Sequence, residues 1–131
     1  MRQDKYKYEN LKTLARVFYG KRNIKRALEM YNKAYELPGG KEDVELLLDM
    51  AFLYDELEED EEAEEKFSEV ISINPGEPRG YYGLGIINDN RGEADKALEY
   101  YEKAIGLNPL YNRAYFFAAN IYLDMGMTDK A

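Results

Sequence analysis

The feature that most constrains the fold is an internal repeat with a period of 34 residues. The segment Ala97–Ala104 resembles Ala63–Val70, which precedes it by one period, and Ala27–Ala34 is a third version of the pattern. Each segment has an alanine, an aromatic residue four positions later and an apolar residue three positions after that. Asn74-Pro75 and Asn108-Pro109 follow at the same phase. A period of this length is typical of helix–turn–helix units that stack on one another.

The segments between these copies repeat as well. They carry apolar or small residues at spacings of 3, 1 and 3, which place one stripe along a helix. The four copies are Leu11/Leu14/Ala15/Phe18, Leu47/Met50/Ala51/Tyr54, Tyr81/Leu84/Gly85/Asn88 and Tyr115/Ala118/Ala119/Tyr122. The small third residue of each set lets a second helix approach closely. We therefore expect helices near residues 8–20, 23–36, 42–57, 60–73, 78–91, 94–107 and 112–125.

Residues that start and stop helices fall at the ends of these segments. The expected N-caps, whose side-chain oxygens accept from free backbone N–H groups, are Asn23, Asp60 and Thr128. Prolines end the second helix of three pairs at Pro38, Pro75 and Pro109. Glycines mark the tight turns inside three pairs at Gly20, Gly92 and Gly126. Gly39-Gly40 is expected to loosen the turn after the first pair.

These residues resemble the tetratricopeptide repeat, whose pattern is Trp-x2-Leu-Gly-x2-Tyr, then Ala-x3-Phe, then Pro. The third copy matches best, through Leu84, Gly85, Ala97 and Tyr101, and departs at Asn88, where an aromatic residue is usual. The resemblance covers about residues 8–131, as repeats at about 8–43, 44–77 and 78–111 and an incomplete one at 112–131. It implies an all-α fold, a right-handed α-solenoid of antiparallel helix pairs, forming a single domain over residues 1–131.

Composition excludes several classes of function. The chain contains no cysteine and no histidine, which excludes disulfides, Cys/His zinc sites, thiolate nucleophiles and imidazole acid–base chemistry. No inward pair of carboxylates is identified, so we expect no enzyme activity and no cofactor or metal. No stretch is apolar and long enough to cross a membrane, and the start does not resemble a signal peptide, so no direct membrane insertion is expected. The lack of cysteine suits a reducing compartment, and a cytoplasmic location is expected.

The resemblance implies that first helices line a concave groove, in which a peptide or helix of a partner protein binds. The lining positions of the family predict a binding site in this chain made of Lys12, Arg16, Leu48, Asp49, Phe52, Arg79, Tyr82, Ile86, Arg113, Phe116, Phe117 and Asn120; Tyr19 and Glu56 occupy lining positions too. Six of these twelve are apolar and are not expected to pack within one helix pair. An apolar strip in a groove is typical of a binding surface, although neighbouring helices could cover several of them. We therefore predict a non-enzymatic interaction scaffold, with Phe52, Tyr82, Ile86 and Phe116 as anchors.

Family members that bind chaperone tails hold the terminal carboxylate with Lys, Asn, Asn, Lys and Arg. This chain has Lys12, Arg16, Asp49, Arg79 and Gly83 at those five positions. Asp49 repels a carboxylate and Gly83 supplies no donor, so we expect no recognition of such a tail. Lys12, Arg16 and Arg79 could still form a looser anion site.

Charge is unevenly distributed along the chain. Residues 44–77 hold 13 Asp or Glu and one Lys, whereas residues 1–43 hold 11 Lys or Arg and 6 Asp or Glu. The acidic run at 55–65 is either a docking patch for a basic partner or a solvated helix start. An alternative function follows: a self-assembling unit that forms homo-oligomers through these opposite charges or through an uncapped apolar C-terminal edge. Because the chain is acidic overall, with a pI of about 4.7, we expect no nucleic-acid binding.

Overall fold

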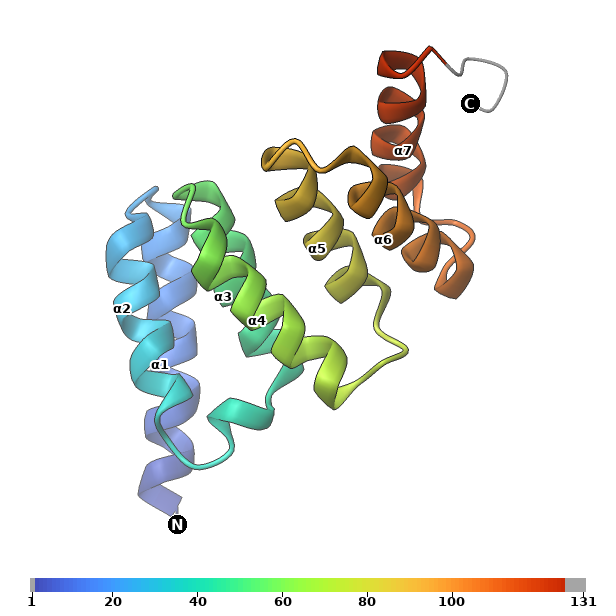
Figure 1. Cartoon of the computed structure of the whole chain (residues 1–131). Coiled ribbons are helices and arrows are strands. Elements are labelled where there is room, and N and C mark those ends of the chain that lie inside the picture. The colour runs from blue at the N-terminus through green and yellow to red at the C-terminus, as the bar shows by residue number, and fades with distance from the viewer. Residues whose placement is uncertain (1, 127–131) are drawn as a thin grey trace. The chain divides into compact units, whose positions relative to one another are not determined.

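The computed structural model describes residues 2–126, which contain α-helices and one 3-10 helix but no strand. The helices are α1 (Arg2–Gly20), α2 (Ile24–Tyr35), η1 (Gly40–Glu42), α3 (Val44–Glu56), α4 (Asp60–Ile73), α5 (Pro78–Asn90), α6 (Ala94–Leu107) and α7 (Asn112–Asp124) (Figure 1). The all-α class predicted from the repeat is confirmed. The chain divides into two compact units, Met1–Ala63 and Glu64–Ala131; its assignment as a single domain stays a prediction.

Most helix ends lie within two residues of the expected positions. The exception is α1, which begins at Arg2 rather than near residue 8. Residues 2–7 contain no proline or glycine, so nothing in them stops the helix from extending. The Asn23 side chain caps α2 by accepting from the N–H of Arg26 at 3.2 Å, as expected. Asp60 is instead the first residue of α4, and Thr128 lies outside the described residues.

The core of the first unit joins α1, α2 and α3. Alanines with no exposed surface, Ala15 on α1 and Ala27 and Ala34 on α2, let these helices approach closely. Tyr31 and Met50 fill the space around them and are also buried. This packing places the hydroxyl end of Tyr31 next to α3, where the pocket described below is found.

The Gly39-Gly40 pair forms a close turn, and the expectation that it loosens the chain is wrong. Gly39 has a φ of +87°, a conformation that glycine adopts without strain. Gly40 lies so close to the end of α2 that a Cβ atom there would be 2.4 Å from the carbonyl oxygen of Ala34. The turn leads directly to Asp43, whose carboxylate accepts from the N–H of Leu46 and caps α3.

The second unit is packed around glycines in α5. A Cβ atom on Gly83 would lie 2.2 Å from the ring of Phe67, and one on Gly85 would lie 2.5 Å from the ring of Tyr101. Both rings are fully buried. Gly85 therefore has the role expected of it, since its small size lets α6 pack closely against α5.

Besides Gly39, four residues that follow a helix adopt the left-handed conformation, and only two of these four are glycine. Gly92 and Gly126 have φ angles of +77° and +75°, whereas Arg22 and Glu58 have +62° and +61°. The role expected of Gly20 is wrong, because Gly20 is the last residue of α1 and Arg22 makes the left-handed turn.

Candidate functional site

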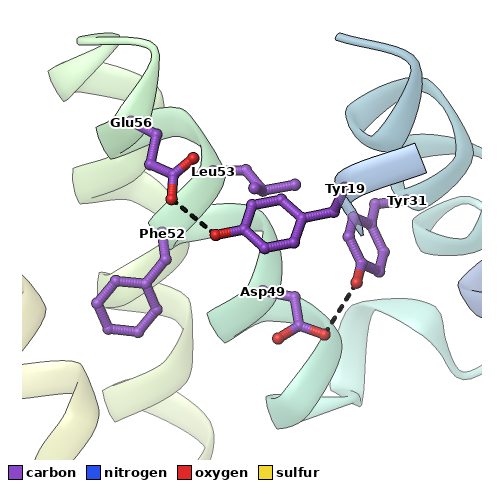
Figure 2. A pocket seen from close by; sticks show the side chains of 6 residues that line it. All are labelled: Tyr19, Tyr31, Asp49, Phe52, Leu53 and Glu56. Atoms are coloured by element: carbon purple, nitrogen blue, oxygen red, sulfur yellow. Dashed lines mark hydrogen bonds between the residues drawn. The ribbon is translucent and has the colours of Figure 1, made fainter. Parts of the chain in front are cut away.

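The first unit contains a pocket of about 170 Å³ between the ends of α1 and α2 and one face of α3. Its lining residues are Tyr19, Tyr31, Asp49, Phe52, Leu53 and Glu56. Figure 2 shows the two phenol groups reaching toward α3. The Tyr19 hydroxyl donates to Glu56 Oε1 at 2.9 Å, and the Tyr31 hydroxyl donates to Asp49 Oδ2 at 3.1 Å. Two of the predicted groove residues, Asp49 and Phe52, are thus brought together here.

The electrostatics of this pocket centre on Asp49. Burial raises the pKa of Asp49, and the nearby Glu45 adds to the increase, while the Tyr31 hydroxyl, Arg16 and Lys12 oppose it. The pKa of Tyr31 is raised as well, by burial and then by the charge of Asp49. The raised pKa of Asp49 indicates a carboxylate that the surrounding positive charge does not fully compensate.

Lys12 forms an ion pair inside the first unit. Its Nζ lies 3.0 Å from Asp43 Oδ2, and the residue is only 9% exposed. The Tyr8 hydroxyl donates to the same carboxylate oxygen. Burial raises the pKa of Asp43, but the hydrogen bonds from Tyr8, Lys12 and the N–H of Leu46 outweigh this effect, and the pKa lies below its ordinary value. Lys12 is therefore not available to a ligand in this structure, and the expectation that it contributes to an anion site has no support.

A second, open pocket of about 520 Å³ lies in the second unit, where α5 and α7 begin. It brings together Arg79 and Arg113, two of the predicted groove residues, with Glu77 and Tyr111. Glu77 caps α5 and also binds the Arg79 guanidinium with both oxygens, at 3.0 and 2.8 Å. These hydrogen bonds from Arg79 lower the pKa of Glu77. Burial, with the proximity of Tyr82, raises the pKa of Tyr111 to about 12.

Tyr82 and Phe117 belong to an aromatic cluster inside the second unit. The ring centroid of Tyr82 lies 6.1 Å from that of Tyr101 and 5.0 Å from that of Tyr111, and the Phe117 ring stacks on Tyr101 at 6.0 Å. Tyr82 is only 4% exposed. The expectation that Tyr82 is not packed within its helix pair is wrong, because Tyr101 belongs to the second helix of that pair. Its proposed use as an exposed anchor is therefore not supported.

The remaining predicted residues divide by exposure. Leu48 is 2% exposed and lies in the core. The alternative expectation, that other side chains cover some of the apolar lining residues, is therefore confirmed for Leu48. Ile86 is partly buried. Arg16 and Asn120 are exposed, and Phe116 is 62% exposed, an unusual state for a phenylalanine.

Sequence reasoning did not assign Tyr31 and Leu53 to a site. Tyr31 occupies the repeated aromatic position of the second helix, and that position indicates core packing. Only the hydroxyl group distinguishes it from a phenylalanine, and its partner Asp49 comes from a different helix. The signal that could have identified Tyr31 is a tyrosine in place of phenylalanine at this repeated position, together with an aspartate at a lining position of the next helix.

The acidic run is partly paired within the chain. Glu64 lies 3.1 Å from Arg91, and Glu65 lies 3.6 Å from Lys66. Asp60, Glu61 and Glu62 occupy the first turn of α4, where the helix dipole favours negative charge. Within residues 7–126, no three acidic side chains are close enough together to hold a metal ion.

Comparisons with known proteins identify the repeat. The sequence model of the tetratricopeptide repeat family matches residues 78–111. The crystal structure of MamA has 28% identity and a TM-score of 0.83, covering 93% of this chain and 70% of MamA. The structure of YrrB, described as a TPR protein with an unusual peptide-binding site, has 25% identity and a TM-score of 0.77, covering 83% of this chain and 55% of YrrB.

A third solved structure is more distant in sequence. The first TPR of Spaghetti (RPAP3), bound to the HSP90 peptide SRMEEVD, has 18% identity and a TM-score of 0.83, covering 92% of this chain and 94% of that one. At this identity the likeness shows a shared fold. No curated protein sequence is significantly similar to the chain. No helix within residues 2–126 has the length and apolar character needed to span a membrane. Residues 78–111 thus match the tetratricopeptide repeat, and the structural matches show that the chain has the fold of tetratricopeptide repeat proteins.

Proposed function

We propose that this protein is a non-enzymatic scaffold that binds a peptide or helix segment of a partner protein on the faces of α1, α3, α5 and α7. One observation carries the proposal: four of the predicted lining residues line two pockets, each inside one unit. Asp49 and Phe52 line the pocket of the first unit, and Arg79 and Arg113 line that of the second. Pockets in which a few polar groups converge with aromatic side chains are typical of ligand sites.

The similar proteins support the same class of function. The RPAP3 repeat is bound to a peptide, and YrrB is described with a peptide-binding site. We do not expect this chain to bind a peptide by its terminal carboxylate, because two of the positions that would hold the carboxylate are not available. Lys12 pairs with Asp43, and Gly83 is buried against Phe67. We therefore propose a ligand that is recognised by its side chains and not by a free C-terminus.

The test is selection of random twelve-residue peptides displayed on phage against the immobilised chain, followed by calorimetry of the enriched sequences. We expect peptides that share a motif and bind with one-to-one stoichiometry. The double variant Arg113→Ala/Phe116→Ala is expected to weaken binding at least about tenfold, the size of effect that truncating anchor residues produces. Lys96→Ala is the matched control, since Lys96 is an exposed cation on α6 outside both pockets.

Failure to enrich any peptide over an uncoated surface would contradict the scaffold function. Equal binding by the double variant and the control would refute the assignment of the face while leaving the scaffold function in place. Circular dichroism of each variant checks that the helices are retained.

Exposed apolar side chains on α7 favour self-association as a second candidate function. Tyr115 and Leu123 are 47% and 51% exposed, in addition to Phe116. Light scattering behind size exclusion at several concentrations distinguishes the two candidates. A mass that stays at 15.3 kDa would remove self-assembly, whereas a mass that rises with concentration and falls in the Phe116→Ala variant would support it. The cytoplasmic location expected from the cysteine-free sequence stays a prediction.

A further inference from the structure

We propose that the pocket of the first unit binds the cationic side chain of an arginine or lysine residue of the partner, held between the Asp49 and Glu56 carboxylates and the aromatic rings of Tyr19 and Phe52, beside the Tyr31 hydroxyl. This inference rests on the proposed function and specifies its ligand. It assigns the pocket a chemistry opposite to that of the carboxylate clamp found in chaperone-binding relatives.

The size of the pocket fits one side chain. Its volume of about 170 Å³ is below the roughly 300–1,000 Å³ of sites for drug-sized ligands. It equals the space of roughly five or six waters at about 30 Å³ each. An arginine or lysine side chain has the right shape for it, since an apolar stem can lie along Leu53 and Phe52 while the charged head reaches the carboxylates.

The aromatic walls are suited to a cation, and one arginine of the chain already lies over the ring of a wall residue. The Arg22 guanidinium lies 5.5 Å from the centre of the Tyr19 ring. Aromatic rings attract guanidinium and ammonium groups through the negative charge of their faces. Arg22 does not line the pocket, so a ligand cation would lie against the ring surfaces that do line it.

The two carboxylates retain acceptor capacity. The hydrogen bonds from Tyr31 and Tyr19 use Oδ2 of Asp49 and Oε1 of Glu56. An ionised carboxylate has two oxygens and about four acceptor sites, so each group can accept further hydrogen bonds. The phenols also hold both carboxylates in position (Figure 2). A guanidinium or ammonium group supplies only donors and matches this arrangement.

The cations of the chain balance the negative charge of Asp49 only in part. Arg16, Lys12 and Glu45 are the charged groups that act on Asp49 besides its own partners. Lys12 is committed to Asp43, and Glu45 adds negative charge. Arg16 is exposed and does not line the pocket, but it interacts with the Tyr31 hydroxyl and acts on Asp49, so it is an internal competitor of a ligand cation. Burial raises the pKa of Asp49, and a bound cation would compensate this unfavourable burial of charge.

The experiment is an NMR titration of the ¹⁵N-labelled full chain with N-acetyl-arginine methylamide and with N-acetyl-lysine methylamide. The neutral isostere N-acetyl-citrulline methylamide is the ligand control. We expect saturable shifts of the amides of residues 49–56 with one or both cations, and an affinity for citrulline about five- to tenfold lower, as expected for loss of partly exposed charge and cation–π contacts. The two cations separate guanidinium from ammonium selectivity. Equal shifts with citrulline, or no shift with either cation, would overturn the inference.

Substitutions of the pocket residues test whether the cation binds in the pocket. Asp49→Asn and Glu56→Gln are each expected to weaken binding of the better cation about three- to tenfold, since each removes one charge and keeps the shape of the side chain. Glu59→Gln is the matched control, because Glu59 is an exposed acidic residue that does not line the pocket. Arg16→Gln is expected to strengthen binding by about twofold or more by removing the competitor. A weaker affinity in Arg16→Gln, or equal loss in Glu59→Gln, would contradict the proposal.

The outcomes separate this inference from the scaffold function. Peptides from the phage selection that bind wild type and Glu56→Gln equally well would leave the scaffold in place and refute the cation pocket. Saturable binding of the cation without any selected peptide would support the pocket and contradict the scaffold. Enriched peptides that contain a shared Arg or Lys, and lose about tenfold in affinity when it becomes citrulline or norleucine, would support both.

Discussion

Glu58 provides a quantitative test of how the turns of the repeat are built. It has a φ of +61° in the turn between α3 and α4, at the position that Gly92 occupies one period later with a φ of +77°. A residue with a Cβ atom is strained in this conformation by about 1–2 kcal/mol. Glycine removes the strain but loses more backbone entropy on folding, by roughly 0.5–1 kcal/mol. Glu58→Gly is therefore expected to stabilise the fold by about 0.5–1 kcal/mol.

The matched variants isolate the backbone effect. Glu58→Ala removes the same charge from the acidic run but keeps the Cβ atom, so it is expected to be about 0.5–1 kcal/mol less stable than Glu58→Gly. Gly92→Ala is expected to destabilise by about 1 kcal/mol for the same reason. Gly20→Ala is expected to have the opposite sign, with a gain of about 0.4–1 kcal/mol, because Gly20 ends a helix without positive φ and has nothing within 4 Å of its Cβ position.

Urea unfolding followed by circular dichroism at 222 nm measures these differences. With an m-value of about 2 kcal/mol per molar urea, typical of small proteins, a change of 1 kcal/mol moves the midpoint by about 0.5 M. We expect the midpoints to rise for Glu58→Gly and Gly20→Ala and to fall for Gly92→Ala at a constant m-value. A midpoint for Glu58→Ala as high as that of Glu58→Gly would refute the assignment of the left-handed turn.

Two further predictions concern residues of the core and of the first helix pair. Tyr82→Ala is expected to lower the free energy of unfolding by about 3–5 kcal/mol in the same assay, because it leaves a cavity beside Tyr101. Phe116→Ala is expected to lower it by less than about 1 kcal/mol, because Phe116 is 62% exposed. Equal losses in the two variants would contradict the burial of Tyr82 and the exposure of Phe116. Asp43→Asn removes the charge that faces Lys12. Because the folded-state pKa of Asp43 lies below its ordinary value, the carboxylate stabilises the fold above the unfolded-state pKa of about 4 and loses this contribution as the pH falls through the folded-state pKa. The stability of wild type relative to Asp43→Asn is therefore expected to be greatest near neutral pH and to vanish in acid; a difference that is constant with pH would contradict it.

The repeat period predicted most of the helices because each helix needs a buried stripe to pack against its neighbours. Ala15, Ala51 and Gly85 occupy the close-packing position in three successive copies, and each is buried. Such positions are readable from one sequence because their spacing follows from the 3.6-residue turn of the helix. The turn at Arg22 was not readable, since Gly20 carries the stronger composition signal two residues earlier. The first repeat is longer than 34 residues, so its turn lies out of phase with the later copies.

The candidate site could be predicted only in part. Asp49 and Phe52 were found because they occupy lining positions on the face of one helix. Tyr31 and Tyr19 donate to residues of another helix that are 18 and 37 positions away in sequence. No local sequence pattern indicates such pairs. Tyr82 was misassigned for a similar reason. Its lining position indicated a groove residue, but the rings of Tyr101, Tyr111 and Phe117 enclose it.

The proposed scaffold function requires that the first helices of the repeats, and not the second helices, present the binding surface. The most direct measurement is a map of backbone amide shifts of the ¹⁵N-labelled chain on titration with the tightest peptide from the phage selection. We expect the largest shifts in α1, α3, α5 and α7, including residues 49–56 and 113–120. Shifts that are confined to α2, α4 and α6, with those segments unchanged, would contradict it.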